Sequence, residues 1–487
     1  MSSYFRKVGF GLAKNDEIPN DPLIWATNQF DNYHDLIWSE KLPTVEDQRE
    51  KFRQFIYEDE KLRKRFRKNR MEYETEKNKL RAQTGEKFFE PFELSIRHHN
   101  ALHNGVPAFE RMWHFWGNHF SLSDKDFLSS WHYGPYMREV IRPSMDKTFE
   151  EMVVEVTTSW AMIHHLDNSE NIGPNSIQGK RENSDGDKRK VGLNENHARE
   201  LLELHTVSPA SGYNQADVID MARVLTGWGK KWSKKNLWAG PIGFQPERHD
   251  MGQKTILGKT YNSKNNKITG NKQLFAVIKD LCNHASCREF VAKKLCQHFV
   301  TDEPSQDMIN PIIQAWLKSD GFLPDIHKAT MKVAFEYGNK YKKFLMPETW
   351  LIQNAKMLNF KHYWGPDKFV FIAGRRPAKR EKKIQWILED LGHPVFRASQ
   401  PNGFIDKEDE WTSPELIIRR MVYANQFQSY LKGIKKENRS LYNNEFYEKI
   451  IYKNFDNPEN VLKLVLSANT TQNRFVMFAN IPEVLKV

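Results

Sequence analysis

One short segment carries much of the chain's potential chemistry. Residues 194–206, NENHARELLELHT, hold three glutamates, an arginine and two histidines within about four helical turns. At roughly 100° per residue, one face of this helix carries four polar side chains, those of Asn196, Arg199, Glu200 and Glu203. A mostly buried helix with such a face needs partners or a ligand for it. The segment predicts either a functional site or a structural ion-pair network.

The two glutamates set the chemistry that such a site would have. Glu200 and Glu203 are three residues apart, so they could share a divalent metal ion, or one could stay protonated and act as a general acid. Arg199 favours the alternative, because arginine neutralises carboxylates without metal. The spacing matches neither HExxH nor ExxH. His205 lies roughly 140° from Glu200 on an ideal helix, so we expect it to support the core.

Three further segments supply polar groups. FWGNHF contains Asn118 and His119, HHLDN contains Asp167, and the loop RHDMGQK contains His249, Asp250 and Lys254. Each segment also has a purely structural interpretation. These are, in order, a hydrogen-bonded core histidine, a helix cap, and a turn with local hydrogen bonds.

If the segments converge on one pocket, their side chains take three roles. The candidate catalytic residues are Glu200, Glu203, His249 and Asp250. The candidate substrate-binding residues are Arg199, Lys254, Asn118 and Asn196. The candidate metal ligands are His119, Asp167, Glu200 and Glu203.

The elements that must position these residues are helices. Apolar residues recur at helical spacing along most of the chain, and the predicted class is mainly α, a multi-helix globular protein with long loops and at most a small β-hairpin near Thr255–Tyr261. Asn214 is expected to cap a helix that follows it. We expect a main domain over residues 1–340, with a charged, exposed helical segment near 45–87, and a C-terminal helical part over 341–487 packed on it.

The bulk composition excludes several classes. Hydrophobic residues make up 39% of the chain, which is too many for a disordered protein. The net charge of +11 permits an anionic partner, but the basic run 61–70 has too few interleaved aromatics to favour nucleic acid. No apolar run could span a membrane, and no signal peptide is visible, which predicts a cytoplasmic protein, with export left open.

Several segments together resemble one family. They are FWGNHFSLS (115–123), HLDN (165–168), NENHARELLELHT (194–206), YNQADVIDMARVLTGW (213–228), RHDMGQKTILG (248–258), FVAKKLCQHFVTDEPS (290–305) and the block 391–415. In this order they are similar to the bacterial domain of unknown function 1800 family over nearly the whole chain. The resemblance implies that the candidate residues occupy motif positions, but it implies no reaction. His197 stands where the family usually has tyrosine or phenylalanine, and Ser208-Pro209 stands where it has a glycine.

Two functions remain open on this evidence. The first is an enzyme with a polar pocket of carboxylates, histidine and Arg/Lys, acting by metal-assisted hydrolysis or a related reaction on a polar or anionic substrate. The second is a non-catalytic helical partner or scaffold protein, whose Glu-Arg-His cluster is a buried ion-pair lattice. A protein partner fits the second, and the sequence names no substrate, metal or partner.

Overall fold

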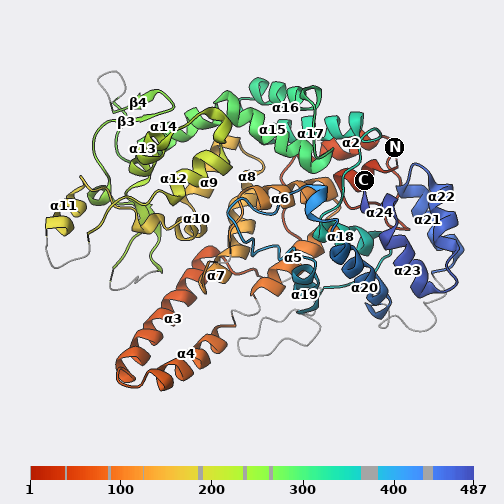
Figure 1. Ribbon diagram of the computed structural model, residues 1–487, viewed down its shortest axis with the longest axis horizontal. Coiled ribbons are helices and arrows are strands. Elements are labelled where there is room, and N and C mark those ends of the chain that lie inside the picture. Colours follow the sequence, from red (N-terminus) through yellow and green to blue (C-terminus); the bar gives the residue numbers. More distant parts are fainter. Residues whose placement is uncertain are drawn as a thin grey trace.

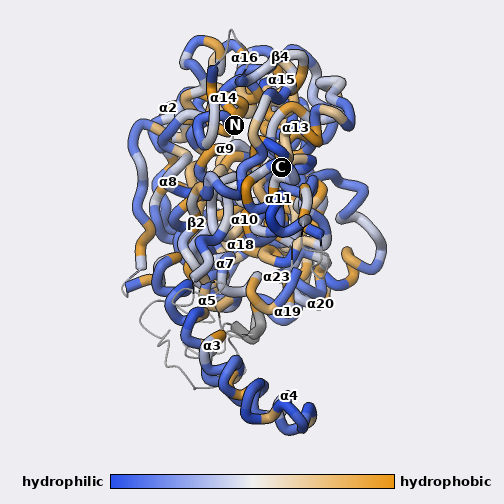
Figure 2. Tube along the Cα trace, turned by 90° about the vertical axis from the view of Figure 1, so that its left-hand side faces the viewer, coloured by the Kyte–Doolittle hydropathy of each residue, from blue (hydrophilic) through white to orange (hydrophobic). Residues whose placement is uncertain are grey.

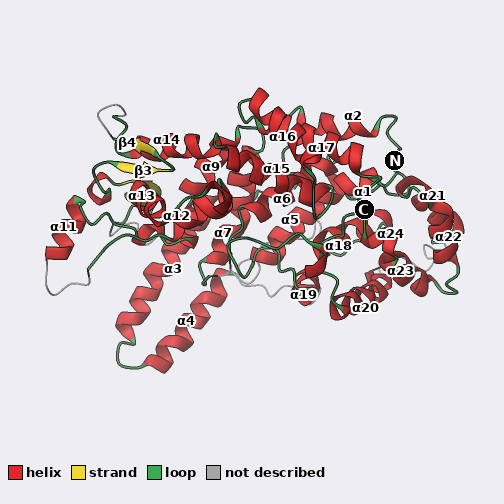
Figure 3. Ribbon diagram, turned by 45° about the horizontal axis from the view of Figure 1, so that its top comes forward, coloured by secondary structure: helices red, strands yellow, loops and turns green. Residues whose placement is uncertain are grey.

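The structure is a computed structural model that describes residues 2–38, 41–85, 89–123, 125–184, 190–233, 239–262, 267–363, 382–430 and 442–487. Helices dominate these residues, and the strands in them form two antiparallel pairs (Figure 3). The predicted mainly α class is confirmed. None of the described helices combines the length and apolarity that crossing a bilayer requires.

The first part of the chain builds the centre of the body. Its helices are α1 (Tyr4–Val8), α2 (Pro22–Thr27), α5 (Phe89–His103), α6 (Pro107–His119), α7 (Ser129–Pro135), α8 (Arg142–Ser144), α9 (Phe149–Thr158) and α10 (Trp160–His165). A π-helical turn, η3 (Tyr136–Ile141), joins α7 to α8. Helix α6 is buried along most of its length, and Trp113 and Trp116 place its aromatic face in the core.

A charged hairpin projects from this body. Helices α3 (Val45–Arg65) and α4 (Arg70–Thr84) run side by side and extend away from the other elements (Figures 1 and 2). A capping box of Thr44 and Asp47 starts α3. Phe52 and Phe55 anchor its base in a small hydrophobic cluster with Trp131. The last residues of the predicted segment, 86–87, lie outside the described residues.

The middle of the chain carries most of the family-like segments. Its elements are α11 (Ile177–Ser184), α12 (Asn196–Glu200), η5 (Leu201–His205), α13 (Gln215–Leu225), β1 (Trp228–Lys230), β2 (Ile242–Phe244), β3 (Lys254–Ile256), β4 (Lys259–Tyr261), α14 (Asn271–Cys282), α15 (Ala285–Phe299), α16 (Gln306–Lys318) and α17 (Leu323–Tyr337). Asn214 caps α13 as expected, with Asp217 completing a capping box.

The β3–β4 hairpin occupies the place predicted for it. Thr255 pairs with Thr260, and Leu257 and Gly258 both have positive φ between the strands, as a two-residue type I′ turn requires. The second pair, in which Trp228 of β1 faces Phe244 of β2, was not predicted.

The C-terminal part packs on the centre. It consists of α18 (Pro347–Met357), α19 (Lys382–Asp390), α20 (Pro414–Tyr430), α21 (Asn444–Asn454), α22 (Pro458–Leu466), α23 (Thr471–Asn480) and α24 (Pro482–Leu485). One hydrophobic cluster includes side chains from Tyr4 to Val487, so the core is continuous across the predicted boundary at 340. The Arg6 Nε atom donates to the Asn454 carbonyl at 2.8 Å, which ties the N-terminal segment to α21 near the chain ends (Figure 1).

Candidate functional site

A large cleft opens where the hairpin meets the body. Its volume is about 740 Å³, and it is lined by side chains of α3, α10, β1 and the loops beside them. Its apolar lining residues include Phe52 and Ile56 of α3 and Leu128 and Ile163 of the body. Its polar lining residues include Asp59, Glu60 and Arg63 of α3 as well as His164, Asp167, Lys230 and Arg248. Clefts of this size with converging polar groups are the usual form of small-molecule sites.

Lys230 and His164, which line the cleft, form a chain of contacts with Asp126. Nζ of Lys230 lies 2.9 Å from Nδ1 of His164, and Nε2 of His164 lies 3.0 Å from Oδ2 of Asp126. Because Asp126 accepts a hydrogen bond, it favours the neutral imidazole tautomer with its proton on Nε2. The Nδ1 lone pair then accepts a hydrogen bond from the lysine. The arrangement is a Lys–His–Asp relay.

Burial and neighbouring charge tune this relay. Burial lowers the pKa of Lys230 to about 8, although the negative charge of Asp126 opposes the decrease. Burial likewise lowers the pKa of His164, although the hydrogen bond to Asp126 opposes it. Burial raises the pKa of Asp126, but its hydrogen bonds to His164 and to the amides of Leu128 and Ser129 outweigh burial and bring the pKa to about 2. Near neutral pH, Asp126 is an anion and Lys230 can exchange its proton.

The HLDN segment holds the relay together. Asn168 donates from Nδ2 to the Leu225 carbonyl at 3.1 Å and to the Trp228 carbonyl at 2.7 Å, which fixes the end of α10 against β1. Asp167 adopts a left-handed backbone with φ of 58°, and its carboxylate accepts a hydrogen bond from Lys125. Of the predicted site residues, Asp167 is the one that lines the cleft.

The glutamate helix differs from an ideal α-helix. Helix α12 ends at Glu200 and continues as one π-helical turn, η5, through His205. Such turns are rare and shift the faces of a helix relative to the α-helical pattern. The side chain of His197 is fully buried, and neither ring nitrogen has a hydrogen-bond partner within the described residues. The ring of His197 is therefore part of the core.

Glu200 and Glu203, on the predicted polar face, are half-exposed, and neither lines the cleft. Burial and the charge of Glu203 raise the pKa of Glu200, and Glu203 accepts a hydrogen bond from the Tyr213 hydroxyl at 3.0 Å. Arg199 pairs with Glu195 at 3.0 Å and not with Glu200 or Glu203, so the expected arginine neutralisation occurs one turn earlier. Asn196 is exposed at the start of the helix.

The predicted metal ligands do not gather. His119 is buried in the aromatic core, with Nε2 3.3 Å from the carbonyl of His205. His205 is buried against Phe120 and supports the core, as predicted from its angle to Glu200. Asp167 binds Lys125 at the cleft instead. Within the part of the chain that the structure describes, no three His, Cys, Asp or Glu side chains form a group that could hold a metal ion.

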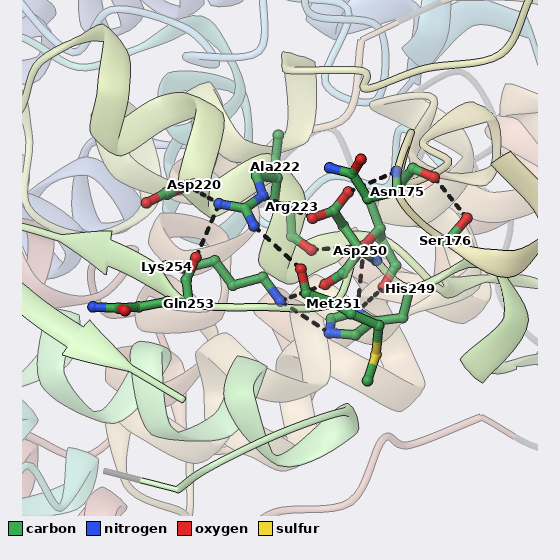
Figure 4. A network of polar contacts seen from close by, with 12 residues as sticks. Asn175, Ser176, Asp220, Ala222, Arg223, His249, Asp250, Met251, Gln253 and Lys254 are labelled. Carbon is green, nitrogen blue, oxygen red and sulfur yellow. Dashed lines mark hydrogen bonds and ion pairs between the residues drawn. The ribbon is translucent and has the colours of Figure 1, made fainter. Parts of the chain in front are cut away.

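The RHDMGQK loop forms a closed network of its own (Figure 4). Lys254 donates to the Asp250 carbonyl and to Oε1 of Gln273, both at 2.6 Å, and lies 3.1 Å from Nε2 of His249. The Asp250 carboxylate accepts from Nε of Arg223 at 2.8 Å. His249, Asp250 and Lys254 are each at most 2% exposed. Because their polar groups satisfy one another inside the fold, this geometry favours a structural role for the loop.

A second buried network lies at the centre of the molecule, where the sequence analysis placed no site. Glu348 of α18 accepts two hydrogen bonds from Arg97, at 2.7 and 3.0 Å, and its Oε1 lies 3.1 Å from Nε2 of His98. The His114 ring lies beside the same carboxylate. Burial raises the pKa of Glu348, but Arg97 and the histidines outweigh burial and hold the pKa well below its usual range. The adjoining cavity, about 30 Å³, has room for water only.

Asn118 belongs to this central region. Its Oδ1 accepts from the Phe404 amide and its Nδ2 donates to the Phe404 carbonyl, both at 2.8 Å. Asn118, which was predicted to bind substrate, therefore joins the C-terminal loop to α6 by two hydrogen bonds, as paired backbone strands are joined.

Sequence reasoning missed the principal residues of the cleft. Asp126, His164 and Lys230 lie far apart in the chain and share no motif spacing. The available signal was His164, the first histidine of HHLDN, shortly before the residues that were singled out.

The fold and the cleft define a multi-helix protein with a polar, solvent-open pocket at the base of a charged hairpin. A family model, described as a protein of unknown function (DUF1800), matches residues 5–481. The chain belongs to this family. No curated protein and no solved structure matches it.

Proposed function

We propose that the protein is an enzyme that transfers a proton to or from a substrate bound in the Lys230 cleft. The observation that carries the proposal is the Lys230–His164–Asp126 relay, whose Lys230 and His164 line an open cleft of about 740 Å³. A lysine with a pKa of about 8 can both hold and release a proton near neutrality, which suits a general acid or base.

The step uses the chain's own side chains and solvent water. As an acid, the Lys230 ammonium gives one proton to a substrate oxygen or nitrogen and becomes a neutral amine. His164 holds the amine in place, and Asp126 fixes the orientation of the imidazole. Solvent then returns the proton to Lys230. Hydrolysis of a polar substrate, the class expected from the sequence, is one reaction that needs such a step.

The cleft also limits the kind of substrate. Phe52 and Ile56 offer apolar surface, and Asp167 and Arg248 offer opposite charges. A molecule that combines an apolar group with polar or charged groups fits such a lining.

The alternative is a non-catalytic scaffold or partner protein. The observation that favours it is the buried ion pairing at the centre, where Arg142 and Glu110 are fully buried at 2.6 Å and Arg97 pairs with Glu348. Such pairs fix helix packing without any need for a substrate.

A turnover experiment separates the two functions. The purified protein is incubated with a small-molecule extract of bacterial cells, and the compounds are followed by mass spectrometry. We expect conversion of at least one compound, slowed by about 100-fold or more in Lys230→Met. Lys318→Met, which changes an exposed lysine on α16, serves as the matched control and should convert at the parent rate. Absence of conversion by the parent protein, or equal conversion by Lys230→Met, contradicts the enzyme proposal and favours the scaffold.

A further inference from the structure

In residues 61–71, at the tip of the α3–α4 hairpin, all side chains except those of Leu62 and Phe66 are exposed to solvent. The buried residues of α3 lie between Gln48 and Asp59, toward its base, and α4 has no buried residue. A helix of 21 residues is about 30 Å long, so the tip stands well away from the body (Figures 1 and 2). The α3 residues that line the cleft reach from Phe52 to Arg63, and residues 64–71 lie beyond them.

The tip is strongly basic. Residues 61–71, KLRKRFRKNRM, contain seven lysines and arginines and no carboxylate. Lys61 and Arg63 pair with carboxylates one turn back in α3. Within the described residues, no ion pair neutralises the other five, which are Lys64, Arg65, Arg67, Lys68 and Arg70. Their positive charges lie together at the tip of the hairpin.

One apolar side chain stands among these charges. Met71 is 81% exposed, although a methionine is normally buried. Phe66 at the turn is half-buried, with the Arg65 guanidinium 5.0 Å from its ring centre. The tip therefore offers a cluster of cations around an exposed apolar group, and it offers few aromatic faces on which bases could stack.

We propose that the hairpin tip docks on the surface of an anionic lipid bilayer. Basic residues near such a surface are attracted to its headgroups, and several together give a useful affinity. Met71 can enter the boundary between headgroups and acyl chains, where an exposed apolar side chain gains most from leaving water. The hairpin then keeps the rest of the protein at a distance from the membrane surface. This inference is independent of the proposed function.

The test measures co-sedimentation of the full-length protein with vesicles. One set contains phosphatidylcholine alone, and the other contains phosphatidylcholine with one quarter phosphatidylglycerol. We expect binding to the anionic vesicles at about 0.05 M salt and its loss at about 0.5 M salt, where charges are screened within a few ångströms. The variant Arg65→Gln/Arg67→Gln/Lys68→Gln/Arg70→Gln should bind at least tenfold more weakly. None of these four residues lines the cleft, so failure here leaves the enzyme proposal untouched.

A charge-matched variant makes the result specific. Lys272, Lys293, Lys318 and Lys332 are exposed lysines of the body, and their replacement by glutamine removes the same net charge. We expect this variant to bind like the parent. Equal weakening of both variants, or no binding of the parent to anionic vesicles at low salt, would overturn the proposal.

Two further measurements test the choice of a lipid surface. Met71→Ser should weaken vesicle binding at least threefold while the melting temperature stays that of the parent. Tighter, tip-dependent binding to a DNA or RNA oligonucleotide than to vesicles at the same salt would replace the lipid surface with nucleic acid. Unchanged vesicle binding by Met71→Ser would also count against membrane docking.

Discussion

The Nζ atom of Lys230 lies 2.9 Å from Nδ1 of His164, a residue 66 positions earlier in the chain. The contact forms because Asn168 ties the end of α10 to the carbonyls before and within β1. Asp126, at the loop before α7, completes the relay from a third element. Lys230 and His164 line an open cleft, whereas His249, Asp250 and Lys254 are buried.

Lys230 should react as an amine at a lower pH than ordinary lysines. Burial lowers its pKa to about 8, so its neutral, nucleophilic form is abundant above that pH. An unperturbed lysine has a pKa of about 10.4. Brief labelling with an acylating reagent at a series of pH values, read by peptide mass spectrometry, should give Lys230 a midpoint near pH 8. A midpoint for Lys230 above about pH 10 would show that burial does not lower its pKa.

Glu348→Ala should destabilise the protein strongly. The change leaves the Arg97 guanidinium buried without its carboxylate, and breaking such a pair costs about 3–5 kcal/mol. Urea unfolding followed by circular dichroism measures the loss. Glu415→Ala is the control, because Glu415 pairs with Arg419 on the exposed surface of α20, where a pair contributes about 1 kcal/mol or less. Similar losses in both variants would mean that the central pair has no special role.

Asn118→Ala should loosen the C-terminal loop around Phe404. The amide and carbonyl of Phe404 both lose their Asn118 partner, at a cost of about 1–3 kcal/mol. Limited proteolysis should cut the loop between residues 398 and 411 faster than in the parent. Asn310→Ala, which alters an exposed asparagine of α16, should leave the cleavage rate unchanged. If Asn118 bound substrate instead, its loss would affect turnover and not proteolysis.

Glu200→Gln should leave stability unchanged or raise it slightly. Burial and the charge of Glu203 raise the pKa of Glu200, so the folded protein disfavours the ionised form that is present at pH 7. A neutral glutamine removes this unfavourable charge, and we expect a change within about 1 kcal/mol by urea unfolding. A loss of several kcal/mol would contradict this expectation and support the buried Glu–Arg ion-pair network that the sequence suggested for this helix.

The folded protein should lose stability steeply between pH 6.5 and pH 4. Burial lowers the pKa of four histidines to about 3 or 4: His165, His197, His327 and His393. In the unfolded chain each titrates near 6.5, so below that pH the unfolded state binds more protons and gains stability. Each contributes up to about 1.4 kcal/mol per pH unit. Melting temperatures measured from pH 7 to pH 4.5 should fall continuously, and a constant value over this range would contradict the burial of these rings.

Much of the fold could be predicted from the sequence, because its signals are local. Helical spacing of apolar residues and caps such as Asn214 act within a few residues, and the structure has α13 where they predicted it. The hairpin β3–β4 likewise follows from a short turn. The second strand pair, β1–β2, joins segments across a longer connection, and no local pattern indicated it.

The sequence by itself determined the class of fold, the family, and the buried support role of His205. Only the tertiary structure decided which polar residues meet. The π-helical turn at Leu201–His205 shifts the faces of the helix that carries the glutamates. Arg199 pairs with Glu195 instead of Glu200. Lys230, His164 and Asp126 came together through long-range packing. The spacing of residues along one helix determines which side chains share a face. Contacts between distant elements depend on how all the elements pack together in the core.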